Sequence, residues 1–150
     1  MRVMNVLPLV LGLALSAQAL AAKPEIRPLP SQNRCVAMLP SSVPAVILMV
    51  VKDKSSGLQV MMFSSVFDQL KGKEVGGEIS WSKAETINGS FTFNGPAVTL
   101  PMEKKEFFAK TAQGKTLTVK LSEPAGQTIK FDLRDAKSIN KDLDECLSKF

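Results

Sequence analysis

Two stretches of the chain have the spacing of a serine nucleophile and its lysine base. They are Ser80-Trp81-Ser82-Lys83 and Ser138-Ile139-Asn140-Lys141, which both match S-x-x-K, the pattern of penicillin-recognising enzymes. The companion S-D-N motif is missing, and Lys115-Thr116-Leu117 lacks the glycine of K-T-G. Serine and lysine are common in this chain, so we interpret both matches as solvent-facing strand and helix residues. A small Ser/Lys hydrolase stays as an alternative.

Histidine and tyrosine are both absent from the chain. Histidine is the commonest general base and a frequent zinc ligand, so its absence removes the usual serine and cysteine triads and most zinc sites. Acidic residues gather near the C-terminus at Asp142, Asp144 and Glu145. They fit the solvent-exposed face of a helix better than the catalytic pair of a glycosidase, which needs a cleft between its carboxylates. We therefore predict a protein that is not an enzyme and has no cofactor.

Four methionines, Met38, Met49, Met61 and Met62, lie in apolar segments. Thioethers are soft ligands that suit copper(I), so an exported protein could use them for metal binding. Methionine within apolar strands is more often core packing, and we predict that these four fill the core. The sequence predicts no metal site.

The N-terminus has the layout of a secretory signal peptide. Arg2 precedes an apolar run over 6–15, and an alanine-rich stretch follows, which favours cleavage after Ala21. The run is too short for a membrane span, so we predict a signal peptide over 1–21 and a periplasmic or secreted protein without a transmembrane segment. Without Arg2 the formal net charge falls from +5 to +4.

Cys35 and Cys146 are the two cysteines of the chain, and both remain after cleavage. Export places them where disulfides persist, so we predict one structural bridge between them. A thiol pair for redox chemistry or metal binding is the alternative, but the chain has no C-x-x-C motif and no histidine. A bridge that closes a loop of about 110 residues contributes about 5 kcal/mol in the chain-entropy model.

The stretch from 115 to 147 has the clearest local pattern. Apolar residues alternate over 115–121 and again over 127–133, which predicts two half-buried strands. Pro124-Ala125-Gly126 suits a three-residue hairpin loop. Ile139, Leu143, Cys146 and Leu147 then form one helical stripe, which predicts a C-terminal helix. The strand pairs expected from this loop are Leu117 with Leu133, Val119 with Phe131, and Leu121 with Ile129.

Upstream, turn residues separate short apolar segments. Residues 22–32, with three prolines, are predicted to be an extended leader, and one domain is predicted over 33–150. The segment 45–51 is apolar nearly throughout, which predicts a central strand covered on both faces. The remaining predicted elements are strands at 33–39 and 58–63, a hairpin of 78–87 with 90–93 around Asn88-Gly89 that includes a bulge or a three-residue loop, a turn at Asn94-Gly95-Pro96, a strand at 97–100, and a helix at 102–113 closed by Gly114.

Short strands at close spacing favour a mainly β protein. We predict an antiparallel β-sandwich or barrel-like sheet, with a short helix before the last hairpin and a C-terminal helix.

This order of elements resembles that of the invasion-associated locus B family of exported bacterial proteins. The resemblance rests on the early Cys35, on Leu100-Pro101 before a helix that bears phenylalanines, on the segments 114–119 and 126–133, and on the closing helix. It implies a periplasmic β-sandwich with a link to host interaction. It implies no catalytic residues.

The predicted helix at 102–113 carries our candidate binding surface. Phe107 and Phe108 are neighbours, and neighbouring helix positions point about 100° apart, so one ring can join the core while the other stays near solvent. Lys104, Lys105 and Lys110 would surround that ring with positive charge. The alternative is that both rings are buried.

We expect the partner to be a protein or an anionic envelope component rather than a nucleic acid. An inhibitor or immunity-type protein that acts on an envelope hydrolase is an alternative. Its basic charge suits a basic lysozyme poorly.

Overall fold

The computed structural model describes residues 23–55, 57–82, 85–123 and 127–150. Within these ranges, nine strands form one antiparallel sheet in the order β1-β2-β3-β4-β7-β6-β5-β8-β9. The predicted signal peptide, 1–21, and the predicted loop Pro124-Ala125-Gly126 lie outside the described residues. The strands are β1 (Glu25–Leu29), β2 (Arg34–Pro40), β3 (Ile47–Asp53), β4 (Leu58–Phe63), β5 (Glu74–Ser82), β6 (Glu85–Asn94), β7 (Ala97–Thr99), β8 (Thr116–Leu121) and β9 (Thr128–Asp132).

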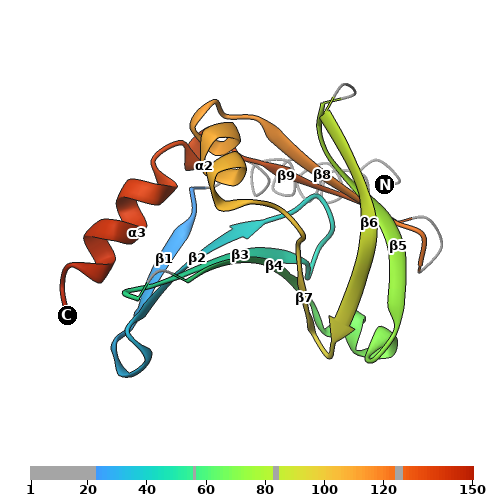
Figure 1. The fold of residues 1–150 in the computed structure, drawn as a ribbon, viewed down its shortest axis with the longest axis horizontal. Coiled ribbons are helices and arrows are strands. Elements are labelled where there is room, and N and C mark those ends of the chain that lie inside the picture. Colours follow the sequence, from blue (N-terminus) through green and yellow to red (C-terminus); the bar gives the residue numbers. More distant parts are fainter. Residues whose placement is uncertain (1–22, 56, 83–84, 124–126) are drawn as a thin grey trace, which may run out of the picture.

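The sheet curls around one apolar core. In Figure 1 it runs from β1–β4 along the lower side, through β7, β6 and β5 on the right, to β8 and β9 at the top. Alternate residues of each strand point inward, and the buried rings of the core come from several distant segments. The predicted mainly β antiparallel class is confirmed, and the sheet is not closed into a barrel. The fully buried phenylalanines are Phe67, Phe91, Phe93, Phe107 and Phe131.

The gap between the first strands and β9 is bridged by the loop after β2. The amide of Ser42 donates to the carbonyl of Lys130, and the Ser42 hydroxyl accepts from the Lys130 amide, both at 2.9 Å. These two bonds satisfy backbone groups that the outer edge of β9 would otherwise leave unpaired.

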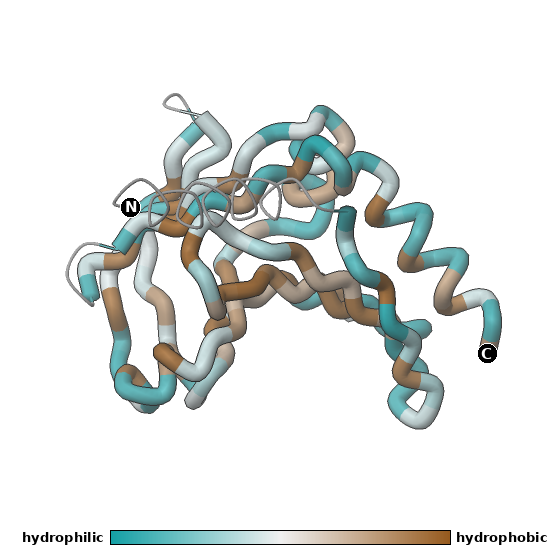
Figure 2. The backbone as a smooth tube through the Cα atoms, turned by 180° about the vertical axis from the view of Figure 1, so that it is seen from behind, coloured by the Kyte–Doolittle hydropathy of each residue, from teal (hydrophilic) through white to brown (hydrophobic). Residues whose placement is uncertain are grey.

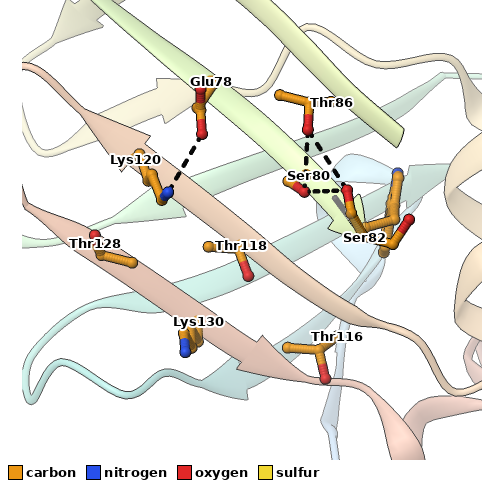
Figure 3. Close-up of a pocket in the computed structure, with 10 residues that line it drawn as sticks. Glu78, Ser80, Ser82, Thr86, Thr116, Thr118, Lys120, Thr128 and Lys130 are labelled. Carbon is orange, nitrogen blue, oxygen red and sulfur yellow. Dashed lines mark hydrogen bonds and ion pairs between the residues drawn. The ribbon is translucent and has the colours of Figure 1, made fainter. Parts of the chain in front are cut away.

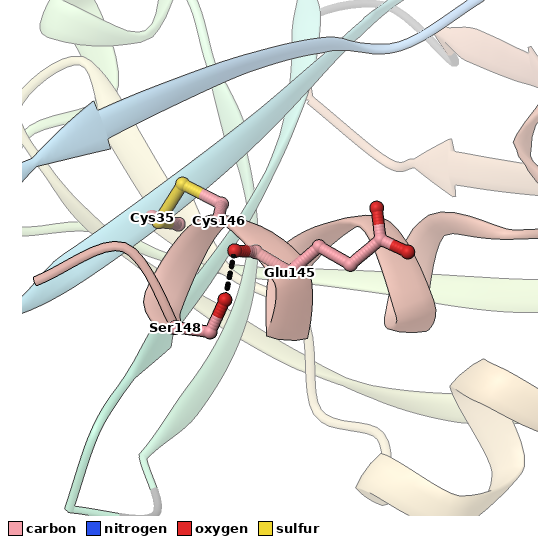
Figure 4. The surroundings of a disulfide bond; sticks show 4 residues. All are labelled: Cys35, Glu145, Cys146 and Ser148. Carbon is pink, nitrogen blue, oxygen red and sulfur yellow. Dashed lines mark hydrogen bonds between the residues drawn. A yellow bond between two sulfur atoms is a disulfide. The ribbon is translucent and has the colours of Figure 1, made fainter.

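Helix α3 (Ile139–Leu147) packs against β1 and β2 and is tied there by a disulfide. The Cys35–Cys146 bridge joins buried cysteines whose Cα atoms are 6.2 Å apart (Figure 4). The predicted bridge is therefore confirmed. The predicted stripe of Ile139, Leu143, Cys146 and Leu147 is buried in full. A short 3₁₀ turn, Arg134–Ala136, leads from β9 toward this helix.

The hairpin of β8 and β9 is present, but its predicted register is wrong by two residues. Leu117 pairs with Phe131 and Val119 pairs with Ile129, and the Leu121 amide donates to the Gln127 carbonyl at 2.9 Å. The connection is therefore longer than three residues. A shift of two keeps every apolar side chain on the same face, so the alternation that predicted the strands does not fix this choice.

The predicted turn at Asn88-Gly89 is wrong, because both residues lie within the long strand β6. Gly89 pairs with Gly77 on β5, and the pairing of β5 with β6 continues to Ser82 and Glu85. Residues 83–84 lie outside the described residues. A Cβ atom on Gly77 would lie 2.4 Å from the Lys120 carbonyl oxygen and 2.7 Å from the Phe91 ring. Glycine at 77 thus permits close packing, and pairing along the whole hairpin outweighs the local turn preference.

Two expectations about the first half of the domain also need correction. The predicted leader, 22–32, contains β1, which pairs with β2 along its whole length, so the sheet begins at Glu25. The segment predicted as a central strand covered on both faces is β3, the third strand from one edge. It is well buried on its inner face, where Leu48 and Val50 are inaccessible, but Ile47 and Met49 are partly exposed on the other.

Other local predictions are confirmed. Gly95 has a φ of 68° in the turn between β6 and β7, which pair directly on either side of it. Helix α2 (Lys104–Ala112) lies inside the predicted range. Gly114 follows it with a φ of 69°, the left-handed conformation that commonly ends a helix. The segment after β4, for which no element was predicted, forms a 3₁₀ helix, Ser65–Leu70.

Candidate functional site

Of the two S-x-x-K matches, the described structure shows both members of one, Ser138 and Lys141, and their side chains have separate partners. The Ser138 hydroxyl donates to the Asp142 carboxylate at 3.1 Å, while the Lys141 ammonium lies 3.9 Å from Glu145. Each side chain therefore interacts with an acidic residue of α3 instead of with the other. Ser80 donates to the carbonyl of Ser82, and its predicted partner Lys83 lies outside the described residues.

A strand end holds an ion pair with perturbed pKa values. The Arg134 guanidinium donates hydrogen bonds of 2.6 to 3.0 Å to both oxygens of Asp132 and so holds the pKa of that carboxyl below its usual range. The carboxylate in turn raises the pKa of Arg134. The two residues are separated by one position in the chain, so this pair is a local structural contact and offers no proton to a substrate.

The structure places one phenylalanine of the α2 surface in the core and the other nearer to solvent. Phe107 is fully buried, with its ring centroid 6.2 Å from that of Trp81, as expected for the ring that joins the core. Phe108 is partly buried, and the Lys52 ammonium lies 5.5 Å from its ring centroid. The second ring therefore remains partly accessible and has a lysine ammonium over it.

The lysines that were expected to surround this ring have different environments. Lys110 forms an ion pair with Glu85, whereas Lys104 and Lys105 are exposed on α2. All five predicted residues lie on α2, with one ring buried and the other partly accessible, and their role in binding a partner stays a prediction.

The outer face of β5, β6, β8 and β9 carries a polar hollow of about 570 Å³ (Figure 3). Serine and threonine side chains line it, together with Trp81 and the charged residues Glu78, Lys120 and Lys130. The charged groups Lys120 and Glu78 lie 3.5 Å apart, and Thr86 donates to Ser80 at 3.4 Å. A polar outer face is ordinary for an antiparallel sheet. This hollow is therefore explained without a ligand.

The outer face of β2, β3 and β4 is different, because six adjacent side chains at one end of it are apolar and accessible. We call these six residues, Met38, Pro40, Ile47, Met49, Met61 and Phe63, the apolar face. The backbone register places them in two adjacent rows, Pro40-Ile47-Phe63 and Met38-Met49-Met61. In Figure 2, the strands along the lower side of the molecule show long apolar stretches in brown.

The apolar face is accessible to solvent. Phe63 is 39% exposed, and the other five residues are partly exposed. A hollow of about 410 Å³ adjoins it, lined by Met38, Pro40 and Ile47 with the charged residues Lys23 and Glu25 at its border. Val66, which follows Phe63 after β4, is also 39% exposed. The described residues thus leave an apolar surface uncovered where an antiparallel sheet would normally be polar.

Sequence reasoning missed this face because it assigned all four methionines to the core. Met62 is fully buried, as predicted, but Met38, Met49 and Met61 are on the outer side. The signal was available in Met61-Met62. Adjacent strand residues point to opposite faces, so a single-sided core can hold only one of the two.

Comparisons with protein-family models, curated proteins and solved structures find no match to the chain. Among the described residues, no helix combines the length and apolar character needed to cross a membrane.

Proposed function

We propose that this chain is an exported, non-enzymatic protein of the bacterial envelope that binds a protein partner through the apolar face. The observation that carries the proposal is the two-row patch of apolar side chains on the solvent side of β2, β3 and β4. Contiguous apolar patches of this kind are uncommon on soluble monomers and mark interaction sites. The predicted signal peptide, the disulfide and the resemblance to the invasion-associated locus B family support an exported protein.

The side chains of the face suit recognition of another protein. Phe63 is its most exposed residue and supplies an aromatic anchor. The three methionines around it are flexible and polarisable, so they can adapt to the shape of a partner. Binding at such a face requires no reactive group, which agrees with the absence of histidine from the sequence.

The charge of the chain indicates the chemistry of the partner. Cleavage of the predicted signal peptide leaves a net charge of +4, which favours encounter with an acidic protein. We therefore expect a partner that has a net negative charge and an apolar patch of its own.

The test compares two variants that introduce the same charge on different outer faces. Phe63→Glu places a carboxylate in the apolar face, and Thr128→Glu places one on the exposed polar face of β9. Each purified protein is cross-linked to envelope extract, and the complexes are quantified. We expect Phe63→Glu to reduce the principal complex at least tenfold and Thr128→Glu to leave it unchanged, with both variants still folded by circular dichroism. Equal capture by folded Phe63→Glu would remove the apolar face from the proposal.

A further inference from the structure

Three methionines of the apolar face lie side by side on three neighbouring strands. Met38 on β2 pairs with Met49 on β3, and Met49 pairs with Met61 on β4. Paired residues of one row point to the same side of a sheet, with their Cβ atoms about 5 Å apart. All three residues are partly exposed, whereas Met62 points into the core. The row therefore presents three thioethers to solvent in one place.

The positions of the three residues allow their sulfur atoms to converge. Met49 occupies the middle strand, and its side chain stands roughly perpendicular to the sheet. Met38 and Met61 flank it at one strand's distance, and methionine has three rotatable bonds with which to lean inward. A single ion above Met49 is within reach of all three side chains.

Methionine thioethers are the main soft metal ligands that this chain offers. There is no histidine, and both cysteines are consumed by the disulfide. Thioether sulfur prefers soft monovalent cations such as copper(I) over magnesium, calcium or zinc. In the part of the chain that the structure describes, no group of three acidic, cysteine or histidine side chains is placed to hold a metal. Competing sites for a hard cation are thus missing there.

The surroundings of the row favour a soft ion. Pro40, Ile47 and Phe63 form the apolar row on one side, and Val36 and Val51 lie on the other. These side chains limit the access of water to the sulfur atoms. Glu25 of β1 lies opposite Met38 at the end of the row and could offset the charge of a bound cation, although its carboxylate already contacts Arg27 at 2.8 Å.

We propose that Met38, Met49 and Met61 form a thioether site for one copper(I) or silver(I) ion. The ion binds and leaves as a monovalent cation, so no electron transfer is involved. The site does not rest on the proposed partner, because it needs nothing but the side chains of this chain.

Silver(I) is the probe, since it has the same preference for thioethers and does not cycle between oxidation states under the assay conditions. The purified protein, with its disulfide intact, is titrated with silver nitrate in chloride-free buffer. Calorimetry gives the stoichiometry and the dissociation constant. Assigned methionine methyl resonances in the NMR spectrum identify the ligands. We expect one ion per chain and shifts at Met38, Met49 and Met61, with the Met62 methyl unmoved.

A matched pair of substitutions tests the assignment. Met49→Leu removes the central sulfur at nearly constant volume, and Met62→Leu removes a neighbouring sulfur from the core side. We expect at least a tenfold weaker affinity for Met49→Leu and an unchanged affinity for Met62→Leu. Unchanged binding in folded Met49→Leu, or shifts spread equally over all methionines, would overturn the site. Phe63→Glu keeps all three thioethers, so loss of partner capture in that variant with silver(I) binding retained separates the proposed function from this site.

Discussion

Removing the Cys35–Cys146 bridge should cost the fold a large part of its stability. The bond closes a loop of 111 residues, and loop closure of that size is worth about 5 kcal/mol in the chain-entropy model, while measured native bridges usually contribute about 2–5 kcal/mol. Both cysteines are buried and α3 packs on the strand that carries Cys35. We therefore expect a loss of about 3–5 kcal/mol in the free energy of unfolding when the bond is absent.

The assay is urea denaturation of four proteins: wild type, Cys35→Ala, Cys146→Ala and the double variant. Breaking the bond from either end removes the same constraint from the unfolded chain, so the two single variants and the double variant should lose nearly the same free energy. Independent packing losses would instead add together. Hydrogen exchange should show faster opening of α3 in all three variants, because α3 is the element that the bond holds against β2.

Two results would refute this reasoning. One is an additive loss, in which the double variant loses the sum of the two single losses, because it would assign the effect to side-chain packing. The other is an unchanged urea midpoint when the wild-type bond is reduced, with complete reduction verified by thiol titration.

Three further perturbations test separate parts of the fold. Gly77→Ala should destabilise the fold by about 1–3 kcal/mol, because the added Cβ would lie 2.4 Å from the backbone of β8. Gly89→Ala on the facing strand, where the nearest contact is 3.8 Å away, should not destabilise it. Urea midpoints compare the two variants, and equal losses would contradict the packing argument. Because the pKa of Asp132 is lowered in the fold, its charge stabilises the fold above the unfolded pKa of about 3.9, and this contribution is lost as pH falls through the lower folded value. Asp132→Asn and Arg134→Gln should therefore each reduce the dependence of stability on pH in acid. Acid unfolding profiles unchanged from wild type would show that the ion pair does not contribute. Ser42→Ala should lower the free energy of unfolding by about 1 kcal/mol, because it removes the hydroxyl that accepts a hydrogen bond from the Lys130 amide of β9. Unchanged thermal unfolding and unchanged amide exchange in β9 would show that water replaces the hydroxyl.

Residue patterns predicted the helices and strands better than they predicted which residues pair between neighbouring strands. The stripe of α3, the bridge and the turn at Gly95 follow from spacing and turn chemistry, which act over a few residues or through a covalent bond. The register of β8 and β9 does not, since apolar alternation is the same after a shift of two residues. The turn predicted at Asn88-Gly89 failed because Gly89 continues a strand opposite Gly77, where packing across three strands decides.

The candidate site was harder to predict for a related reason. Alternation shows that Met61 and Met62 face opposite sides, but it does not tell which side another layer covers. Only the curl of the sheet shows that the core lies against Met62 and that the row from Met38 to Met61 is left outside. The segment 22–32 was predicted to be a leader because its prolines, Pro28 among them, argued against a strand. An edge strand such as β1 tolerates proline, and the sequence does not show which strand lies at the edge.

The two ends of the sheet restrict how a partner can approach. Edge strands commonly recruit an extended peptide as an additional strand, by main-chain hydrogen bonds. Here β1 is short, and its Pro28 offers no N–H, while Ser42 already occupies backbone groups of β9. Recognition by strand addition is therefore disfavoured at both ends. A binding partner has to read side chains on a face of the sheet, and its specificity will depend on shape and not on an extended backbone.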